Sequence, residues 1–267
     1  MSDVSGSRKF LARQRQYWDV LAVNAPDDVL RSHWADSNGQ PVSLQMFADI
    51  AAYLRSEFLS DRESGTVFEL GCGNGLVLRE MVKQLGPQWH VWGVDLSPDM
   101  MHHSLAPQHR LAVADAANVP ARNCVADLVY LHGVTQYFSG ETYLRQVLDE
   151  CVRLTKPGGS ICILDMPISW LADLMSARVT LRQRLRLPGP VVEFLRRIRS
   201  QARSWQFERI GGRLVRVPSF KGFYADPDIF QEYADRFDSV SIQLQPYPTK
   251  PINYRRFRFN AVLKGRR

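Results

Sequence analysis

The sequence lacks any apolar run that approaches the roughly 20 residues of a membrane-spanning helix. Residues 1–16 are polar and basic and have no apolar core, which argues against a cleaved secretory signal. Paired cysteines are also missing, because the four cysteines have no CxxC or other paired spacing; they are Cys72, Cys124, Cys151 and Cys162. We therefore expect a cytoplasmic protein with reduced thiols and no metal site.

Acidic residues are scarce in one segment, and this scarcity explains the basic character of the chain. Between Arg178 and Arg216 there are eleven arginines, two glutamates and no lysine, so the segment carries +9. The whole chain carries +7, which leaves −2 for the remainder. A basic protein suggests a nucleic-acid binder, but here the basic excess belongs to one insert and the rest of the chain is slightly acidic.

The 267 residues, 45% of them hydrophobic, suffice for one large α/β domain. Helical periodicity occurs over residues 8–22 and 41–59, and residues 24–40 read as a loop. From Thr66, short β-prone runs alternate with helical patterns. The predicted strands cover residues 66–70, 89–96, 111–114, 127–132 and 161–164, and the predicted helices cover 75–85, 98–105 and 141–155. This order predicts a parallel sheet with right-handed crossovers.

The alternation stops at Pro167. Residues 168–224 are helix-prone, rich in arginine and interrupted by proline and glycine. A helix beginning at Asp226-Pro227 and two strands, over residues 240–244 and 257–263, then complete the pattern. We predict three parts, namely an N-terminal helical cap over residues 1–60, a core over 61–167 and 225–267, and an insert over 168–224.

A glycine-rich turn follows the first predicted strand, with the sequence Glu69-Leu70-Gly71-Cys72-Gly73-Asn74-Gly75. Glycines allow a sharp turn into a helix whose N-terminal N–H groups approach a ligand. The dinucleotide fingerprint needs glycine at the sixth position of such a motif, where this chain has Leu76, which argues against NAD. Glu69 could meet an ammonium group and would repel a pyrophosphate. Asp95 ends the next strand, roughly where doubly wound folds place a ribose-binding acid.

These segments together resemble class I S-adenosylmethionine-dependent methyltransferases. VFELGCGNG is similar to their first motif, VWGVDLSPDMM to the second and LAVADAANVP to the third, and ADLVYLHGVTQYF and RLTKPGGSICILDMP are similar to the later strands. The resemblance is good over about residues 60–166 and looser over the last strands. It implies an α/β, Rossmann-like fold with a seven-stranded, mostly parallel sheet, an antiparallel last strand and helices on both faces.

The resemblance implies S-adenosylmethionine as cofactor and S-adenosylhomocysteine as product. It places Asp95 on the ribose hydroxyls and Asp115 at the adenine amino group. Similar enzymes fold an N-terminal helix over the cofactor, so Tyr17, beside Trp18, is expected there, where a ring would attract a sulfonium; core packing explains this pair equally well. The expected cofactor-binding residues are Tyr17, Glu69, Gly71, Cys72, Gly73, Gly75, Asp95, Leu96, Met100, Asp115, Ala116 and Leu131.

On the acceptor side we expect His132 and Tyr137. His132 ends the fourth strand, at a position that faces the methyl group in related enzymes, and an unperturbed histidine with a pKa near ~6.5 suits a general base. The alternative is a histidine that only lines the cofactor pocket. Tyr137 would orient the acceptor or simply pack. Inserts at this point commonly form substrate lids in the family, and arginines would suit an anionic acceptor, although a solvated helical face explains the insert equally well.

We therefore predict a methyltransferase of small molecules. Residues 133–167 resemble bacterial enzymes that methylate sugars or specialised metabolites, and O-methylation would give a His132 base a purpose. The alternatives are N-methylation of a small amine, RNA modification through the basic insert, and a non-catalytic cofactor-binding module. The absence of an Asn/Asp-Pro-Pro-aromatic run after the fourth strand disfavours a nucleic-acid substrate. The sequence leaves the oligomeric state open.

Overall fold

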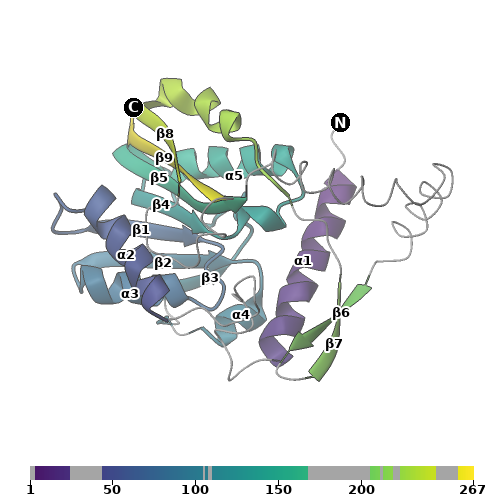
Figure 1. Ribbon diagram of the computed structural model, residues 1–267. Coiled ribbons are helices and arrows are strands. Elements are labelled where there is room, and N and C mark those ends of the chain that lie inside the picture. Colours follow the sequence, from purple (N-terminus) through teal and green to yellow (C-terminus); the bar gives the residue numbers. More distant parts are fainter. Residues whose placement is uncertain are drawn as a thin grey trace.

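The computed structural model describes residues 4–24, 44–104, 106–107, 110–167, 205–210, 213–218, 223–244 and 258–267. Their centre is a seven-stranded sheet in the order β3-β2-β1-β4-β5-β9-β8 (Figure 1). The strands are β1 (Gly65–Leu70), β2 (Trp89–Asp95), β3 (Leu111–Val113), β4 (Ala126–His132), β5 (Thr155–Pro167), β8 (Phe237–Leu244) and β9 (Arg258–Arg266). Strands β1 to β5 are parallel, whereas β9 runs antiparallel to β5 and β8. The predicted fold is confirmed.

Helices cover both faces of this sheet (Figure 1). Helices α2 (Leu44–Phe58) and α3 (Leu76–Leu85) share a hydrophobic core with one face, and α5 (Glu141–Leu154) and the 3-10 helix η3 (Pro227–Arg236) share another with the opposite face. Because successive strand residues point to opposite faces, Tyr130 of β4 joins the α2–α3 side and Leu131 the α5 side. Every residue of β4 is buried, as expected for a strand covered on both faces.

The strand order reverses between β1 and β4. The loops that leave these two strands at their carboxyl ends run in opposite directions, which opens a crevice at that edge of the sheet. The loop after β1 is the glycine-rich turn, and the loop after β4 contains a short 3-10 helix, η2 (Thr135–Tyr137). The short helix α4 (Pro98–His102) follows β2 at the same edge. This topology brings the predicted site residues together.

Helix α1 (Val4–Asn24) stands outside the layers, beside the hairpin of β6 (Trp205–Ile210) and β7 (Arg213–Pro218) (Figure 1). The predicted N-terminal cap therefore contains two helices with different surroundings, since α2 packs into the core of the sheet. Tyr17 and Leu21 of α1 form a small hydrophobic cluster with Val217 of β7.

The insert differs from its prediction where the structure describes it. Residues 205–210 and 213–218 are paired antiparallel strands, so the helical expectation is wrong for them. Along β7, exposure alternates, with Leu214 and Arg216 turned outward and Val217 buried. This period of two, with β-branched residues, is a strand pattern that the abundance of arginine concealed. Residues 168–204 lie outside the described residues, so the substrate lid stays a prediction.

Most other boundaries lie within about three residues of the prediction, but β5 (Thr155–Pro167) is much longer than the predicted strand over 161–164. The helix expected after Asp226 winds as a 3-10 helix, and the Asp226 carboxylate accepts the N–H of Asp228 at 3.1 Å as its N-cap. No described helix combines the length and apolarity needed to cross a bilayer. In the described ranges, no three His, Cys, Asp or Glu side chains gather as metal ligands. The cysteines are unpaired, and all but Cys124 are buried.

A buried acid joins the starts of three strands at the edge opposite the crevice. The Asp127 carboxylate of β4 accepts the Thr66 N–H of β1 at 2.8 Å and pairs with Lys156 of β5 at 2.7 Å. It also pairs with Arg62 at 2.5 Å, and its side chain is only 7% exposed. Removal of this carboxylate would take the acceptor from the Thr66 N–H, the counter-charge from Lys156 and the nearer of two acids from Arg62.

We expect Asp127→Ala to lower the free energy of unfolding by about 2–4 kcal/mol, because it removes the acceptor of the Thr66 N–H and the nearest counter-charge of Arg62 and Lys156. Urea unfolding followed by circular dichroism measures the loss. Asp61→Ala is the matched control, since Asp61 is an exposed acid 3.9 Å from the same arginine, and such a pair contributes less than about 1 kcal/mol. Equal losses in the two variants would contradict a special role for Asp127.

Candidate active site

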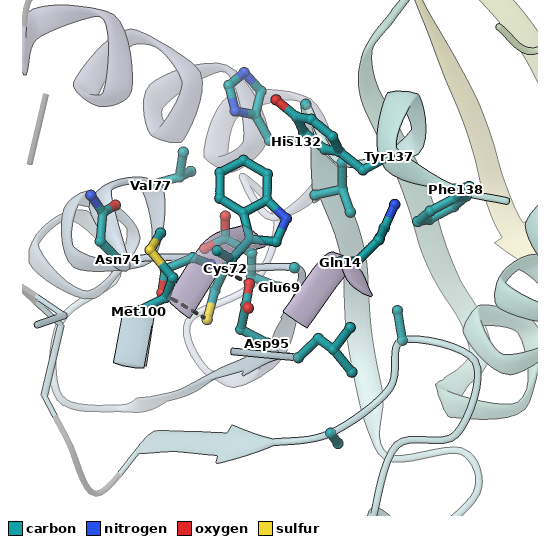
Figure 2. A pocket seen from close by; sticks show the side chains of 18 of the residues that line it. Gln14, Glu69, Cys72, Asn74, Val77, Asp95, Met100, His132, Tyr137 and Phe138 are labelled. Carbon is teal, nitrogen blue, oxygen red and sulfur yellow. Dashed lines mark hydrogen bonds between the residues drawn. The ribbon is translucent and has the colours of Figure 1, made fainter. Parts of the chain in front are cut away.

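A pocket of about 950 Å³, its open mouth included, lies at the carboxyl edge of the sheet beneath α1. Figure 2 shows side chains from β1, β2, β4, η2 and α1 converging on it. Its polar side chains are Gln14, Glu69, Asn74, Asp95, His132, Tyr137 and Tyr143. The described lining contains two acids and neither lysine nor arginine, so its fixed charge is suited to a cation.

The glycine-rich turn is hydrogen-bonded to the end of β2. The N–H groups of Gly71 and Cys72 both donate to the Val94 carbonyl, at 2.7 and 3.0 Å. Gly71 has a φ of 77°, and a Cβ there would lie 2.5 Å from the Val134 side chain. A left-handed φ and the close approach of the loop after β4 both require glycine at this position.

Asp95 fastens the turn from the other side. Its Oδ2 accepts the Gly73 N–H at 2.7 Å, and its Oδ1 accepts the Ser97 N–H at 2.9 Å. The Ser97 hydroxyl caps α4 by accepting the Met100 N–H at 3.1 Å and donates to Asp19 Oδ1 of α1 at 2.5 Å. Burial raises the pKa of the Asp95 carboxyl above its ordinary value. One acid therefore links the turn, α4 and, through Ser97, the helix that covers the pocket.

Glu69, near the end of β1, is the most secluded acid of the pocket, with 3% of its surface exposed. The Tyr130 hydroxyl donates to its Oε2 at 2.9 Å. Burial, assisted by the charge of Asp95, raises the pKa of Glu69 to about 8, and the hydrogen bonds from Tyr130 and the Leu78 backbone oppose this rise only partly. A cation placed beside Glu69 would restore its charge, so the pocket favours a positively charged ligand.

His132 ends β4 and lines the pocket, 7% exposed. Burial first, and then the positive charge of Arg258, lower its pKa to about 3. Arg258 is held nearby by Gln136 Oε1 at 2.7 Å and the Asp165 carbonyl at 2.8 Å. The expectation of an unperturbed histidine is therefore wrong, and the imidazole is neutral at physiological pH.

A family model for a methyltransferase domain matches residues 68–163, the stretch from β1 to β5. The chain carries a class I methyltransferase domain. This match and the sheet order confirm the resemblance drawn from the sequence motifs.

Two curated relatives of the methyltransferase domain differ in what they methylate. A tRNA (carboxymethyluridine(34)-5-O)-methyltransferase of Arabidopsis thaliana is 33% identical over 107 residues, which cover 40% of this chain and 25% of that protein. An arsenite methyltransferase of Halobacterium salinarum is 29% identical over 117 residues, which cover 38% of this chain and 27% of that protein. The chain thus spans about a quarter of the length of these relatives.

Two solved structures resemble nearly the whole chain. Magnesium protoporphyrin IX methyltransferase from Synechocystis has a TM-score of 0.57 and 13% identity, with 97% of this chain and 99% of that chain covered. Geranyl diphosphate C-methyltransferase from Streptomyces coelicolor has a TM-score of 0.54 and 14% identity, with 97% and 98% covered. At such identities the likeness shows that the methyltransferase fold is shared.

Most of the expected site residues lie in the pocket lining of the methyltransferase domain. These are Glu69, Gly71, Cys72, Gly73, Asp95, Leu96, Met100, Ala116, His132 and Tyr137. The motifs after β1 and β2 were informative because each places its side chains directly at a strand end. Their contact with a cofactor stays a prediction, since the pocket supplies their position and not their ligand.

Tyr17 lies outside the lining, contrary to expectation. The pocket face of α1 consists of Leu11, Gln14 and Trp18, at the i, i+3, i+7 spacing of one helical stripe. Tyr17 precedes Trp18 by one residue, about 100° around the helix, and packs toward β7 instead. Trp18 is the aromatic that reaches the pocket, where its ring meets Tyr137 edge-on with 4.8 Å between centroids.

Leu131, Asp115 and Gly75 are also outside the lining. Leu131 alternates with His132 along β4 and therefore points into the core on the α5 side. The Asp115 side chain accepts the Tyr143 hydroxyl at 2.5 Å and the Ala117 N–H at 2.9 Å, and Tyr143 rather than Asp115 lines the pocket.

Gly75 shapes the start of α3 in place of facing the pocket. Its φ is 72°, and a Cβ there would lie 2.4 Å from the Ser104 hydroxyl oxygen. The position needs glycine for the turn and for the approach of the chain after α4.

Several lining residues were absent from the sequence prediction. They are Leu11, Gln14, Trp18, Phe47, Asn74, Leu76, Val77, Ala114, Gly133, Val134, Phe138 and Tyr143. Leu11 and Gln14 could have been found from their helical spacing to Trp18. Phe47 comes from α2, on a separate part of the chain, and no local pattern marks it.

The raised pKa of Glu69 predicts how stability depends on pH. Between its ordinary pKa of 4.5 and about 8, the folded protein holds a proton that the unfolded chain has lost, so stability falls as pH rises through this window. The slope approaches about 1.4 kcal/mol per pH unit. Thermal unfolding of the ligand-free protein from pH 5 to 7.5 measures it.

Glu69→Gln should remove this contribution to the slope, whereas Glu63→Gln, at an exposed acid, should leave it. Parallel pH dependence in wild type and Glu69→Gln would contradict the assignment.

Proposed function

We propose that this chain binds S-adenosylmethionine in the pocket and transfers its methyl group to a small-molecule acceptor. The observation that carries this proposal is that the described lining contains two acids, Glu69 and Asp95, and neither lysine nor arginine. The cofactor offers an ammonium group and a sulfonium to these acids, and its ribose offers hydroxyl donors. A pyrophosphate would instead be repelled, which argues against a dinucleotide.

The residues present fit such a cofactor. The pKa of about 8 at Glu69 suits an acid that becomes charged when a cation arrives. Gly71 keeps the pocket floor free of a side chain. Asp95 is only partly buried despite its two backbone bonds, and it lines the pocket beside Leu96. The bound cofactor would supply an activated methyl group on sulfur.

The chain's own part is to position the acceptor and exclude water. Transfer to a nucleophile in line with the carbon–sulfur bond gains most from orientation in a dry pocket. Trp18 and Tyr137 close the pocket with rings in contact. Phe138 and Tyr143 form a second edge-on pair in the lining, 4.9 Å between centroids. This aromatic wall favours a small acceptor that enters between α1 and η2.

We favour O-methylation of a sugar or specialised metabolite because of His132. A neutral imidazole accepts a hydrogen bond from a hydroxyl group and so orients its oxygen. With a pKa of about 3 it is a weak base in the free protein. An oxygen that is gaining a methyl group becomes strongly acidic, however, so even this histidine can take its proton late in the transfer.

RNA is the second candidate acceptor. The Arabidopsis relative is named as a tRNA methyltransferase, and the segment from Arg178 to Arg216 carries the charge that would contact phosphates. Filter binding of tRNA over a salt series separates the two ideas. A steep loss of affinity with salt favours RNA, and the absence of binding at low salt favours the small acceptor.

Calorimetry with S-adenosylmethionine and S-adenosylhomocysteine tests whether the pocket binds the proposed cofactor. Asp95→Ala should weaken binding by about 1–3 kcal/mol, the scale of a lost charge-assisted hydrogen bond. Asp99→Ala is the control, because Asp99 lies on α4 outside the pocket lining. Thermal unfolding without ligand shows separately how far the glycine turn loosens. Unchanged affinity in Asp95→Ala would remove the ribose assignment.

His132→Ala should leave cofactor affinity intact and slow methyl transfer roughly 10²-fold or more. Single-turnover assays with hydroxylated acceptors, which follow S-adenosylhomocysteine, measure the rate. A near-normal rate would reduce His132 to a lining residue. Because the pKa of His132 is about 3, wild-type kcat should show no histidine-dependent fall from pH 7.5 to 5.5. An acid limb near ~6.5 that disappears in His132→Ala would contradict this environment.

A further inference from the structure

Gln14 carries a buried donor with no partner, and it lies in the pocket. The residue is 7% exposed, on the stripe of α1 that lines the pocket between Leu11 and Trp18 (Figure 2). Within the described ranges its Nε2 makes no hydrogen bond. A buried donor without an acceptor costs roughly 1–3 kcal/mol, so such groups in native proteins call for an explanation.

Three backbone donors of the pocket floor are already in use. Gly71 and Cys72 donate to the Val94 carbonyl, and Gly73 donates to Asp95. The first three N–H groups of the glycine-rich turn therefore stabilise the turn itself. A ligand acceptor atom at this floor cannot use these three donors, and the Gln14 amide faces the same pocket.

The charge of the lining shows which ligand group lacks a partner. The inference rests on the proposed cofactor, whose methionine end carries an ammonium group and a carboxylate on one carbon. Glu69 and Asp95 suit the ammonium group and the ribose. The carboxylate meets two acids and, among the described lining residues, no lysine or arginine. Neutral donors are then the groups that this lining offers to it, and among them the Gln14 Nε2 is the buried one that makes no hydrogen bond within the described residues.

We propose that Gln14 donates a hydrogen bond from Nε2 to the carboxylate of the cofactor's methionine moiety. Gln14 is then a binding residue that recognises the amino-acid end of the cofactor. When an adenosine derivative that lacks this end binds, the Gln14 amide stays buried beneath α1 and gains no hydrogen bond. The Ser97 hydroxyl also donates to Asp19 at 2.5 Å, which fixes α1 against the start of α4.

Two ligands that share the adenosine part test this inference. Calorimetry compares S-adenosylhomocysteine with 5′-methylthioadenosine, which lacks the amino-acid end. Gln14→Met keeps the size of the side chain and removes the donor. We expect its affinity for S-adenosylhomocysteine to fall about tenfold, equivalent to about 1.4 kcal/mol, and its affinity for methylthioadenosine to stay unchanged. Gln16→Met, at an exposed position of the same helix, should alter neither affinity.

Stability without ligand gives an independent readout. Gln14→Met removes a buried, unpaired amide, so the free protein should unfold at the same or a higher temperature while the shift caused by S-adenosylhomocysteine shrinks. A lower unfolding temperature of the free variant would mean that the amide is structural, which overturns the proposal. Gln14→Glu serves if the methionine variant misfolds, since a third acid should weaken S-adenosylhomocysteine much more than methylthioadenosine.

The other outcomes are equally decisive. An equal loss for both ligands would place the contact on the adenosine part and overturn the carboxylate assignment. Unchanged cofactor affinity with a raised KM for the acceptor would assign Gln14 to the acceptor. If wild-type protein binds neither ligand, the proposed function itself fails, whereas a failure confined to Gln14 leaves wild-type binding intact.

Discussion

The Asp95 carboxylate is the contact on which the site edge depends. One of its oxygens holds the glycine-rich turn through Gly73, and the other holds the start of α4 through Ser97. Ser97 then reaches Asp19 on α1. Floor, side and cover of the pocket are thus joined at an acid that also lines it. A change that displaces this carboxylate alters the shape of the pocket as well as its charge.

Two buried acids show how the same chemistry serves stability at one edge of the sheet and binding at the other. Asp127 is surrounded by two cations and a backbone N–H, so its charge is paired within the protein. Glu69 has a tyrosine hydroxyl and a backbone N–H but no cation among the described residues, and burial raises its pKa to about 8. A ligand that places a cation beside Glu69 would supply this counter-charge, and the resulting attraction would favour binding. Sites commonly sacrifice stability in this way.

Local patterns predicted the parts of the site that one segment can specify. The glycine-rich turn, Glu69 and Asp95 each sit at a strand end, where sequence order dictates position. The prediction chose Tyr17 and not its neighbour Trp18, because the side of α1 that faces the pocket is set by the packing of Tyr17 on β7. That strand lies within an arginine-rich segment and was not predicted. The pKa of His132 depends on its burial and on Arg258, which is far from it in the sequence. The orientation of α1 and the environment of His132 both depend on tertiary contacts between distant segments, which local sequence patterns do not indicate.

Helix α1 explains why the sequence motifs indicate a cofactor and leave the acceptor undefined. One stripe of the helix lines the pocket, and the adjacent side packs on β7 of the insert. The motif residues of the pocket lie at the ends of β1, β2 and β4, whereas the Trp18–Tyr137 ring contact comes from α1 and η2. A change in the hairpin can therefore shift Trp18 and Gln14 through Tyr17 without touching a motif residue. The part of the pocket wall formed by α1 can therefore change while the glycine-rich turn, Glu69 and Asp95 stay the same.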